Sequence, residues 1–164
     1  MAVSFGCHIP RHDESNLTQP IIMWCRSKQI GAEIGSKGPC GRILVVGEPG
    51  WEIIPEVKPL PDEIVIDKPG KGSFVATNLD LILKTKGIQN IILAGVTTDV
   101  CVHTTMRHAN DLGYECILLT DCCGATDPKN HDAAISMIQK QGGVFGTVTT
   151  SEKLIASLSS IFEA

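Results

Sequence analysis

The chain has 164 residues, of which 43% are hydrophobic and 20% charged, with a formal net charge of −4, and this fits one soluble domain with a sizeable core. Its 14 Lys and Arg residues form no basic cluster, so we expect neither nucleic acid nor a membrane surface as a partner. No apolar stretch reaches the roughly 18 residues of a membrane span, and the N-terminus lacks a signal-peptide pattern, which favours a cytoplasmic protein.

The first 62 residues are predicted to consist largely of loops. They are rich in proline and contain two turn-forming stretches, SKGPCG and GEPGWEIIPE. In this part, residues 42–46, with the sequence RILVV, are the one apolar run that indicates a strand.

From residue 63 onward, short apolar runs alternate with helical patterns. Continuous apolar runs of this length are typical of strands buried on both faces of a parallel sheet. The fold class predicted from this alternation is α/β with a mostly parallel sheet. The predicted strands cover residues 63–67, 90–95, 115–120 and 143–148, and the predicted helices cover residues 78–87, 99–112, 131–142 and 149–162.

The first and last of these helices carry end signals. The first ends at Gly87, a residue that commonly stops helices. The last begins with Thr149 three residues before Glu152, which is a capping-box pattern. The apolar faces expected to pack on the sheet consist of Leu79, Ile82 and Leu83 in the first helix and Leu154, Ile155, Leu158 and Ile161 in the last.

Three polar or reactive residues follow predicted strands. Lys68 follows the first strand, Cys101 lies at the start of the helix after the second, and Asp121 follows the third. In open α/β sheets the ligand site lies beyond the carboxyl ends of the strands. These residues are therefore the candidates for a functional site.

The cysteine spacing argues against disulfides and a metal site. The count is odd, and no two cysteines form a C-x-x-C pair. His8 and His12 are four residues apart, but Pro10 between them opposes a helix that would bring them together. Most cysteines are expected to be reduced, apolar fillers. They are Cys7, Cys25, Cys40, Cys101, Cys116, Cys122 and Cys123.

Cys101 has two interpretations from the local sequence. A helix start and a nearby cation both favour the thiolate, and amides at that start could bind the oxyanion of a tetrahedral adduct. The alternative is a buried cysteine, because cysteine is among the most buried residue types. Lys68 is equally open, since most lysines at strand ends are ordinary surface residues.

Two long motifs resemble the isochorismatase-like family of cysteine hydrolases. They are VIDKPGKGSF and GVTTDVCVHTTMRHANDLGYECILLTDCCGATD, and the resemblance spans about residues 42–164. The stretches GRILVVGEPGWEIIPE, DKPGKGSF and NHDAAISMIQKQGGVFG are most similar to the biuret and ureidoacrylate amidohydrolase branch. The resemblance implies a three-layer α/β/α fold with a mostly parallel central sheet.

The resemblance also implies roles for individual residues. Cys101 would be the nucleophile, and Lys68 the cation that stabilises the thiolate and the intermediate. The Val96–Thr97 bond would be a non-proline cis peptide that directs the amides of Thr97 and Cys101 at the oxyanion. Gln141 would contact a ureide substrate, although a polar residue at a helix end is the alternative interpretation.

The family's third catalytic group, an aspartate ending its first strand, has no match in this sequence. Asp13 and Asp62 lie in turn-rich stretches, and strand alternation directs Asp67 to the face opposite Lys68. We therefore expect residues 1–164 to form a single isochorismatase-like domain that lacks the family's first strand and helix.

Two hypotheses follow. The first is a cysteine-dependent amidohydrolase that releases ammonia from small ureides or amides, without a cofactor or metal, as a homodimer or homotetramer. The second is a catalytically impaired relative that serves as a binding or assembly subunit. A nicotinamidase-like or isochorismatase-like substrate is a third option, although the metal-binding residues expected of nicotinamidases are not visible.

Overall fold

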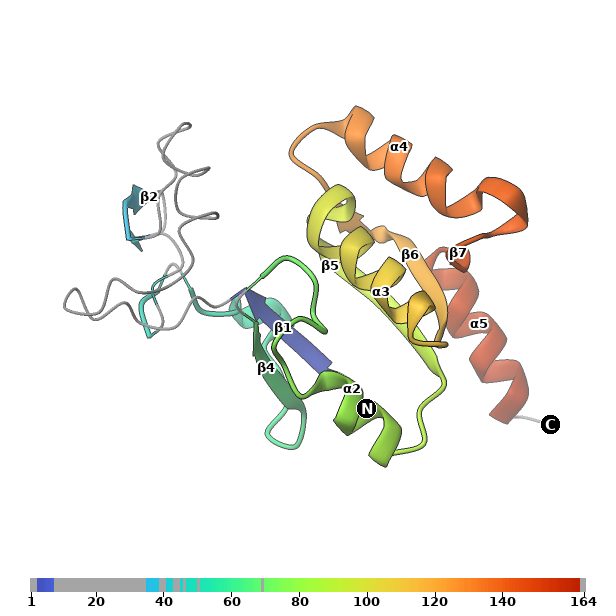
Figure 1. The fold of residues 1–164 in the computed structure, drawn as a ribbon, viewed down its shortest axis with the longest axis horizontal. Coiled ribbons are helices and arrows are strands. Elements are labelled where there is room, and N and C mark those ends of the chain that lie inside the picture. The colour runs from blue at the N-terminus through green and yellow to red at the C-terminus, as the bar shows by residue number, and fades with distance from the viewer. Residues whose placement is uncertain are drawn as a thin grey trace. The chain divides into compact units, whose positions relative to one another are not determined.

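The computed structural model describes residues 3–7, 35–38, 41–42, 45, 47–49, 51–68 and 70–162 (Figure 1). The chain divides into two compact units. The first comprises Met1–Gly70 and Val75–Thr77, and the second comprises Lys71–Phe74 and Asn78–Ala164.

The first unit contains a parallel pair of strands. Strand β1 (Val3–Cys7) pairs with β4 (Ile64–Lys68), which places Cys7 opposite Lys68. Along β4, Lys68 is buried and Asp67 is exposed, so the two side chains lie on opposite faces as predicted. The shorter elements are β2 (Lys37–Gly38) and β3 (Gly41–Arg42), which pair antiparallel, and the 3₁₀ turn η1 (Pro55–Val57). Of the strand predicted at 42–46, residues 43, 44 and 46 lie outside the described residues.

The second unit is built on a parallel sheet of three strands in the order β5-β6-β7. Helices follow each strand, as predicted for crossover connections. The strands are β5 (Asn90–Val96), β6 (Glu115–Gly124) and β7 (Thr147–Thr149), and the helices are α2 (Leu79–Thr85), the π-helical turn η2 (Thr98–Val102), α3 (His103–Asp111), α4 (Pro128–Gln139), the 3₁₀ turn η3 (Lys140–Gly142) and α5 (Ser151–Phe162). The α/β class is confirmed, and the long strands divide between two sheets.

The core of the second unit lies between the sheet and the apolar faces of its helices. Helix α2 buries Leu79 and Leu83 and ends before Gly87, which has a φ of +66°. This agrees with the predicted face and stop. The other buried apolar side chains of the helices and sheet include Leu93, Val102, Met106, Ala109, Cys116, Leu118, Ala134 and Ile138.

The last strand is shorter than the prediction of 143–148. Residues 143–146 instead form a turn, with φ of +95° at Gly143 and +127° at Gly146. At Gly146 a Cβ atom would lie 2.2 Å from the carbonyl oxygen of Cys116, so a side chain does not fit there. The glycines that interrupt the apolar run therefore form a close approach to β6, and the strand begins only at Thr147.

Helix α5 differs from its prediction in two ways. Its first turn is capped by Thr150, whose hydroxyl accepts a hydrogen bond from the backbone N–H of Lys153 at 3.4 Å, whereas Thr149 belongs to β7. The N-cap is therefore Thr150 rather than the predicted Thr149, and the residue three positions later is Lys153 rather than the glutamate of a capping box. Helix α5 contacts β6, but Ile155, Leu158 and Ile161 of its predicted apolar face are exposed.

Strand β5 is not buried on both faces, contrary to the prediction. Leu93 and its register partner Leu118 are buried on one face, whereas Ile92, on the other face, is 50% exposed. In the part of the chain that the structure describes, β5 is an edge strand of its sheet. An apolar run indicates that a strand can be buried, but it does not supply the neighbouring element that buries it.

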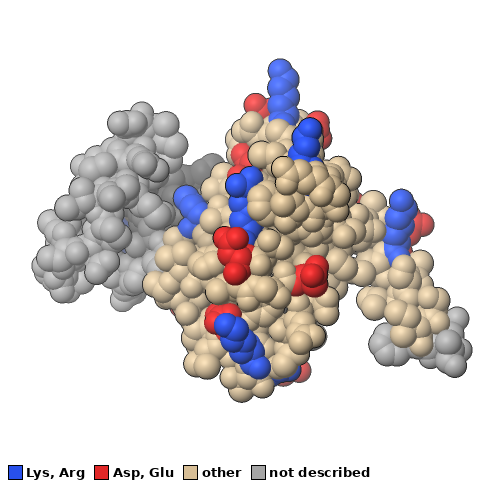
Figure 2. All heavy atoms as spheres, turned by 45° about the vertical axis from the view of Figure 1, so that its right-hand side comes forward, with Lys and Arg blue, Asp and Glu red and all other residues tan. Residues whose placement is uncertain are grey.

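No described helix is long and apolar enough to cross a membrane. On the face shown in Figure 2, basic and acidic side chains are interspersed between neutral residues.

Candidate functional site

Cys101 lies on a tight turn directly after β5. The Val96–Thr97 peptide bond is cis, as the resemblance implied, and Thr97 then adopts an extended conformation. The carbonyl of Thr97 accepts hydrogen bonds from the backbone N–H groups of Val100 (3.2 Å) and Val102 (3.1 Å). These bonds close the π-helical turn η2 and place Cys101 where the strand passes into α3.

Cys101 is a partly exposed free thiol, so it is not the fully buried filler of the alternative interpretation. Cys116 has that role. It is buried, and burial raises the pKa of its thiol to about 11, with the charge of Glu115 adding to the shift. Burial also raises the pKa of Cys123, whereas Cys122 is exposed.

The turn is tied to α3 and to the segment 71–74 by hydroxyl groups. The hydroxyl of Thr105 donates to the carbonyl of Cys101 at 2.7 Å and accepts from the backbone N–H of Ser73 at 3.1 Å. The hydroxyl of Ser73 lies 3.0 Å from the same oxygen. Ser73 and Thr105 lie within the two long motifs, but neither was among the predicted site residues.

A second side-chain hydrogen bond ties the turn to α4. The hydroxyl of Thr98, which is completely buried, lies 2.8 Å from Nδ1 of His131. His131 belongs to the NHDAAISMIQKQGGVFG stretch, which is the signal that could have drawn attention to it. The start of η2 is therefore held by a helix that begins about 30 residues later in the chain.

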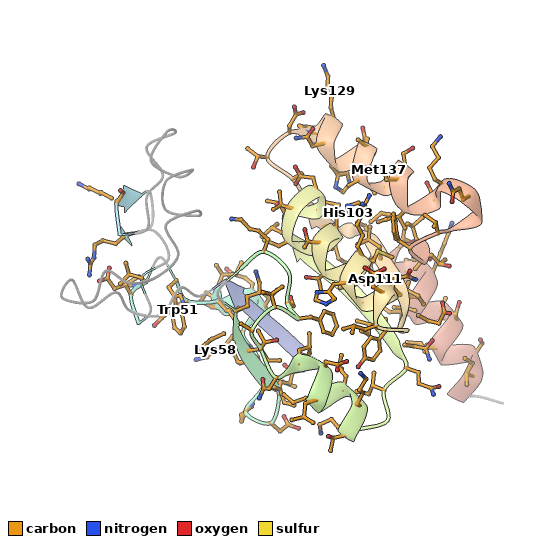
Figure 3. The ribbon with its side chains drawn as sticks, viewed as in Figure 1. Trp51, Lys58, His103, Asp111, Lys129 and Met137 are labelled. Atoms are coloured by element: carbon orange, nitrogen blue, oxygen red, sulfur yellow. The ribbon has the colours of Figure 1, made fainter. Side chains whose placement is uncertain are left out.

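His103 lies on α3 just after this turn, and Figure 3 shows it on the side of α3 that faces α4. It is buried, and burial lowers the pKa of its imidazole, with the charge of Arg107 lowering it further. Its ring meets Phe145 edge to face at 5.9 Å, while the guanidinium of Arg107 stacks on the same ring at 4.3 Å. Burial therefore favours the neutral imidazole of His103, whose buried Nε2 has no hydrogen-bond partner among the described residues. Among the described residues, no group of three or more His, Cys, Asp or Glu side chains is arranged to hold a metal ion.

Lys68 ends β4 in the first unit. Only 3% of the residue is exposed, and its ammonium donates a hydrogen bond to the carbonyl of Gly70 at 2.9 Å. A lysine is rarely buried to this degree unless its charge has partners, so Lys68 is not an exposed side chain, and its role in the site stays a prediction. Cys101 belongs to the second unit, and the pairing of the two residues stays a prediction.

The other two candidates have different environments. Gln141 is exposed in η3 with a φ of +54°, and its contact with a substrate stays a prediction. Asp121 instead caps α5: its carboxylate accepts hydrogen bonds from the backbone N–H (2.9 Å) and the hydroxyl (2.6 Å) of Ser151. These hydrogen bonds lower the pKa of Asp121. Asp121 lies within β6 rather than after a strand as predicted, and its carboxylate caps α5.

Comparison with known proteins identifies the family. The Isochorismatase domain matches residues 21–153. The chain belongs to the isochorismatase family. It is 34% identical over 116 residues to the ureidoacrylate amidohydrolase RutB of Acinetobacter baylyi, covering 70% of this chain and 46% of that protein. It is 29% identical over 141 residues to RutB of Variovorax paradoxus, covering 83% of this chain and 53% of that protein. The chain thus spans about half the length of these curated relatives.

A solved structure supports the same assignment. The chain is similar to a cysteine hydrolase from Pseudomonas syringae pv. phaseolicola, with a TM-score of 0.78 and 26% identity. The match covers 98% of this chain and 72% of that one. The chain therefore has the fold of that cysteine hydrolase.

Proposed function

We propose that this chain is the nucleophile-bearing part of a cysteine-dependent amidohydrolase that cleaves C–N bonds of small ureides or amides. The observation that carries the proposal is the position of Cys101. It is a partly exposed thiol on the turn that follows the cis Val96–Thr97 bond. Thiolates at helix starts are activated nucleophiles, and amides there can bind a developing oxyanion.

We expect the reaction to proceed in two stages. The thiolate of Cys101 attacks the substrate carbonyl, and the resulting oxyanion is stabilised by the amides of Thr97 and Cys101 and by the ammonium of Lys68. The C–N bond then breaks, and the nitrogen leaves as ammonia after accepting a proton. Water attacks the acyl–sulfur bond, releases the acid and restores the thiolate.

The substrate class rests on the relatives and on Gln141. Both curated relatives are ureidoacrylate amidohydrolases, and the solved relative is a cysteine hydrolase. A side-chain amide such as that of Gln141 has both donors and an acceptor, which matches the N–H and C=O groups of a ureide. We expect biuret-like or ureidoacrylate-like substrates and a homodimeric or homotetrameric assembly.

An ammonia-release assay tests the function. Biuret, ureidoacrylate and nicotinamide are each supplied to the unmodified chain, to Cys101→Ser and to Cys122→Ser. We expect ammonia from a ureide, a loss of at least about a thousandfold in Cys101→Ser, and no change in Cys122→Ser, because Cys122 is exposed on β6. Equal turnover by Cys101→Ser and the unmodified chain would exclude the cysteine mechanism.

A second candidate function is a non-catalytic binding or assembly subunit. The favouring observation is that β5 is a sheet edge in the described structure, with Ile92 50% and Val96 75% exposed just before Thr97. An open edge beside the nucleophile weakens the exclusion of water, and the sequence offers no matching aspartate as the base. Stabilisation by a ureide in a thermal shift assay without ammonia release would support this candidate.

A further inference from the structure

The hydroxyl of Thr105 has three partners at hydrogen-bonding distance. They are the carbonyl oxygen of Cys101 at 2.7 Å, the backbone N–H of Ser73 at 3.1 Å and the hydroxyl of Ser73 at 3.0 Å. Both residues are buried, with 4% of Thr105 and 2% of Ser73 exposed. Ser73, Cys101 and Thr105 all belong to the second unit of the chain.

Counting protons fixes the direction of each bond. A threonine hydroxyl has one hydrogen to donate and two lone pairs with which to accept. Its hydrogen points to the Cys101 carbonyl, because a carbonyl can only accept. Both lone pairs therefore accept from Ser73, one from the backbone N–H and one from the hydroxyl. The hydroxyl of Thr105 is fully occupied and held in one orientation.

The bond from Thr105 to Cys101 is common when taken alone. Threonines within helices often donate to the carbonyl four residues earlier, and such a bond needs no function. The contribution of Ser73 is different, because Ser73 is 32 residues away in the chain and supplies two donors from outside the helix. A buried, saturated network of this kind specifies one geometry for the groups it joins.

We propose that Ser73 and Thr105 are positioning residues that hold the backbone of Cys101 in the orientation its thiol chemistry requires. The proposal rests on Cys101 as the nucleophile of the proposed function. Ser73 lies in the same motif as Lys68, five residues later. The DKPGKGSF motif thus contributes Ser73 to the support of the turn that contains Cys101.

The test is the alkylation rate of Cys101 by iodoacetamide, measured by mass spectrometry in two variants that remove hydrogen bonds, in one that restores them and in the double variant. Thr105→Val keeps the shape of the side chain and removes the hydroxyl, and Thr105→Ser restores the hydroxyl. Exposed Cys122 in the same molecule is the reference, and buried Cys116 reports loosening of the fold. We expect Thr105→Val to lower the ratio of Cys101 to Cys122 labelling about three- to tenfold, because a small displacement of a reacting group costs such factors. Thr105→Ser should regain most of the loss.

Ser73→Ala is the second variant, and it keeps the proposal testable if Thr105→Val does not fold. It removes one of the two donors and leaves the backbone N–H, so we expect a smaller decrease of about twofold. The double variant should equal Thr105→Val, since groups in one network are not additive. An unchanged ratio in both single variants would overturn the proposal. So would a change that Thr105→Ser does not reverse, or one that coincides with labelling of Cys116.

Turnover separates this inference from the proposed function. If the unmodified chain releases ammonia, Thr105→Val should lower kcat with little change in KM, because the network holds the nucleophile. If no substrate is turned over, the proposed function fails, and the alkylation ratios still decide whether Ser73 and Thr105 position Cys101.

Discussion

The helical segments that follow the three strands of the β5-β6-β7 sheet differ in whether a side-chain carboxylate caps their N-terminus. Helix α4 begins at Asp127, whose carboxylate accepts a hydrogen bond from the N–H of Lys129 at 2.9 Å. At the start of helix α5, the carboxylate of Asp121 accepts hydrogen bonds from the backbone N–H and the hydroxyl of Ser151. The turn η2 begins at Thr97, and in the described structure the side chain of Thr97 makes no capping hydrogen bond.

This difference in capping distinguishes helix starts that stabilise the fold from a helix start that could bind a negatively charged group. A capping carboxylate satisfies free amides and complements the positive end of the helix, which stabilises the helix and blocks the binding of another anion. In η2 the side chain of Thr97 makes no capping hydrogen bond, and the acidic residue of the first turn is Asp99. Amides that no side chain caps can bind a thiolate or an oxyanion. The chain thus has a capping carboxylate at two of these helix starts and, at the third, the turn that contains Cys101.

The largest expected effect contrasts two cysteines of the same unit. At neutral pH, Cys101 should be the fastest of the seven cysteines to react with iodoacetamide. Cys116 should react more than about a hundredfold slower, because a thiol whose pKa burial raises to about 11 has almost no thiolate there. Mass spectrometry after brief labelling measures both. Faster labelling of Cys122 with Cys101 unmodified would show that the η2 start does not activate its thiol.

The second effect concerns the predicted pairing of Lys68 with Cys101. Lys68→Met should slow the alkylation of Cys101 about tenfold or more, since the loss of a cation within a few ångströms removes that much thiolate. Lys58→Met is the matched control, because Lys58 is an exposed lysine of the same unit. The labelling rate is measured as a function of pH for both variants. Identical rates for the two variants would contradict the pairing of Lys68 with Cys101.

The third effect comes from adding to η2 a capping carboxylate like those at the starts of α4 and α5. Thr97→Asp should slow the alkylation of Cys101 several-fold, because a carboxylate at this helix start disfavours a second negative charge beside it. Thr97→Asn supplies a neutral cap of similar size and should leave the rate nearly unchanged. If the two substitutions have equal effects, side-chain size rather than charge sets the reactivity.

The sequence predicted the parts of the fold that depend on local pattern. The strands beginning at Asn90 and Glu115 appear as apolar runs because a parallel strand buries at least one face continuously. The extension of β6 to Gly124 was missed because its last residues are polar or cysteine and pair with the end of β5 only after a shift in register. The exposed face at Ile92 was missed because it depends on which element lies beside β5.

The site shows the same division. The cis Val96–Thr97 bond and the position of Cys101 on the turn after it could be predicted because they lie within one continuous motif. The bonds of Thr105 to Ser73 and of Thr98 to His131 join residues 32 and 33 positions apart. Hydroxyl groups bond to whatever partner the tertiary structure brings near, so sequence spacing carries no signal for them. Asp121 was a site candidate by its place after a strand, and its actual partner, Ser151, is again a tertiary neighbour.

The smallest expected effect comes from removing the carboxylate that caps the start of α5. Asp121→Ala should lower the melting temperature by about 2–4 °C, as expected for the loss of a helix cap in a chain of this size. The hydrogen bonds from Ser151 hold the pKa of Asp121 below its ordinary value of 3.8. Because the folded pKa lies below the unfolded one, the carboxylate contributes stability above the unfolded pKa and loses it as the pH falls through the folded value.

The difference in melting temperature between the unmodified chain and Asp121→Ala should therefore be full at pH 7 and shrink below about pH 4. Alkylation of Cys101 should not change, because Asp121 serves α5 and not η2. Differential scanning calorimetry across this pH range, combined with labelling at pH 7, measures both quantities. A fall in the labelling of Cys101 without a change in melting temperature would contradict the assignment of Asp121 as the cap of α5. It would indicate that Asp121 acts on Cys101 and belongs to the functional site.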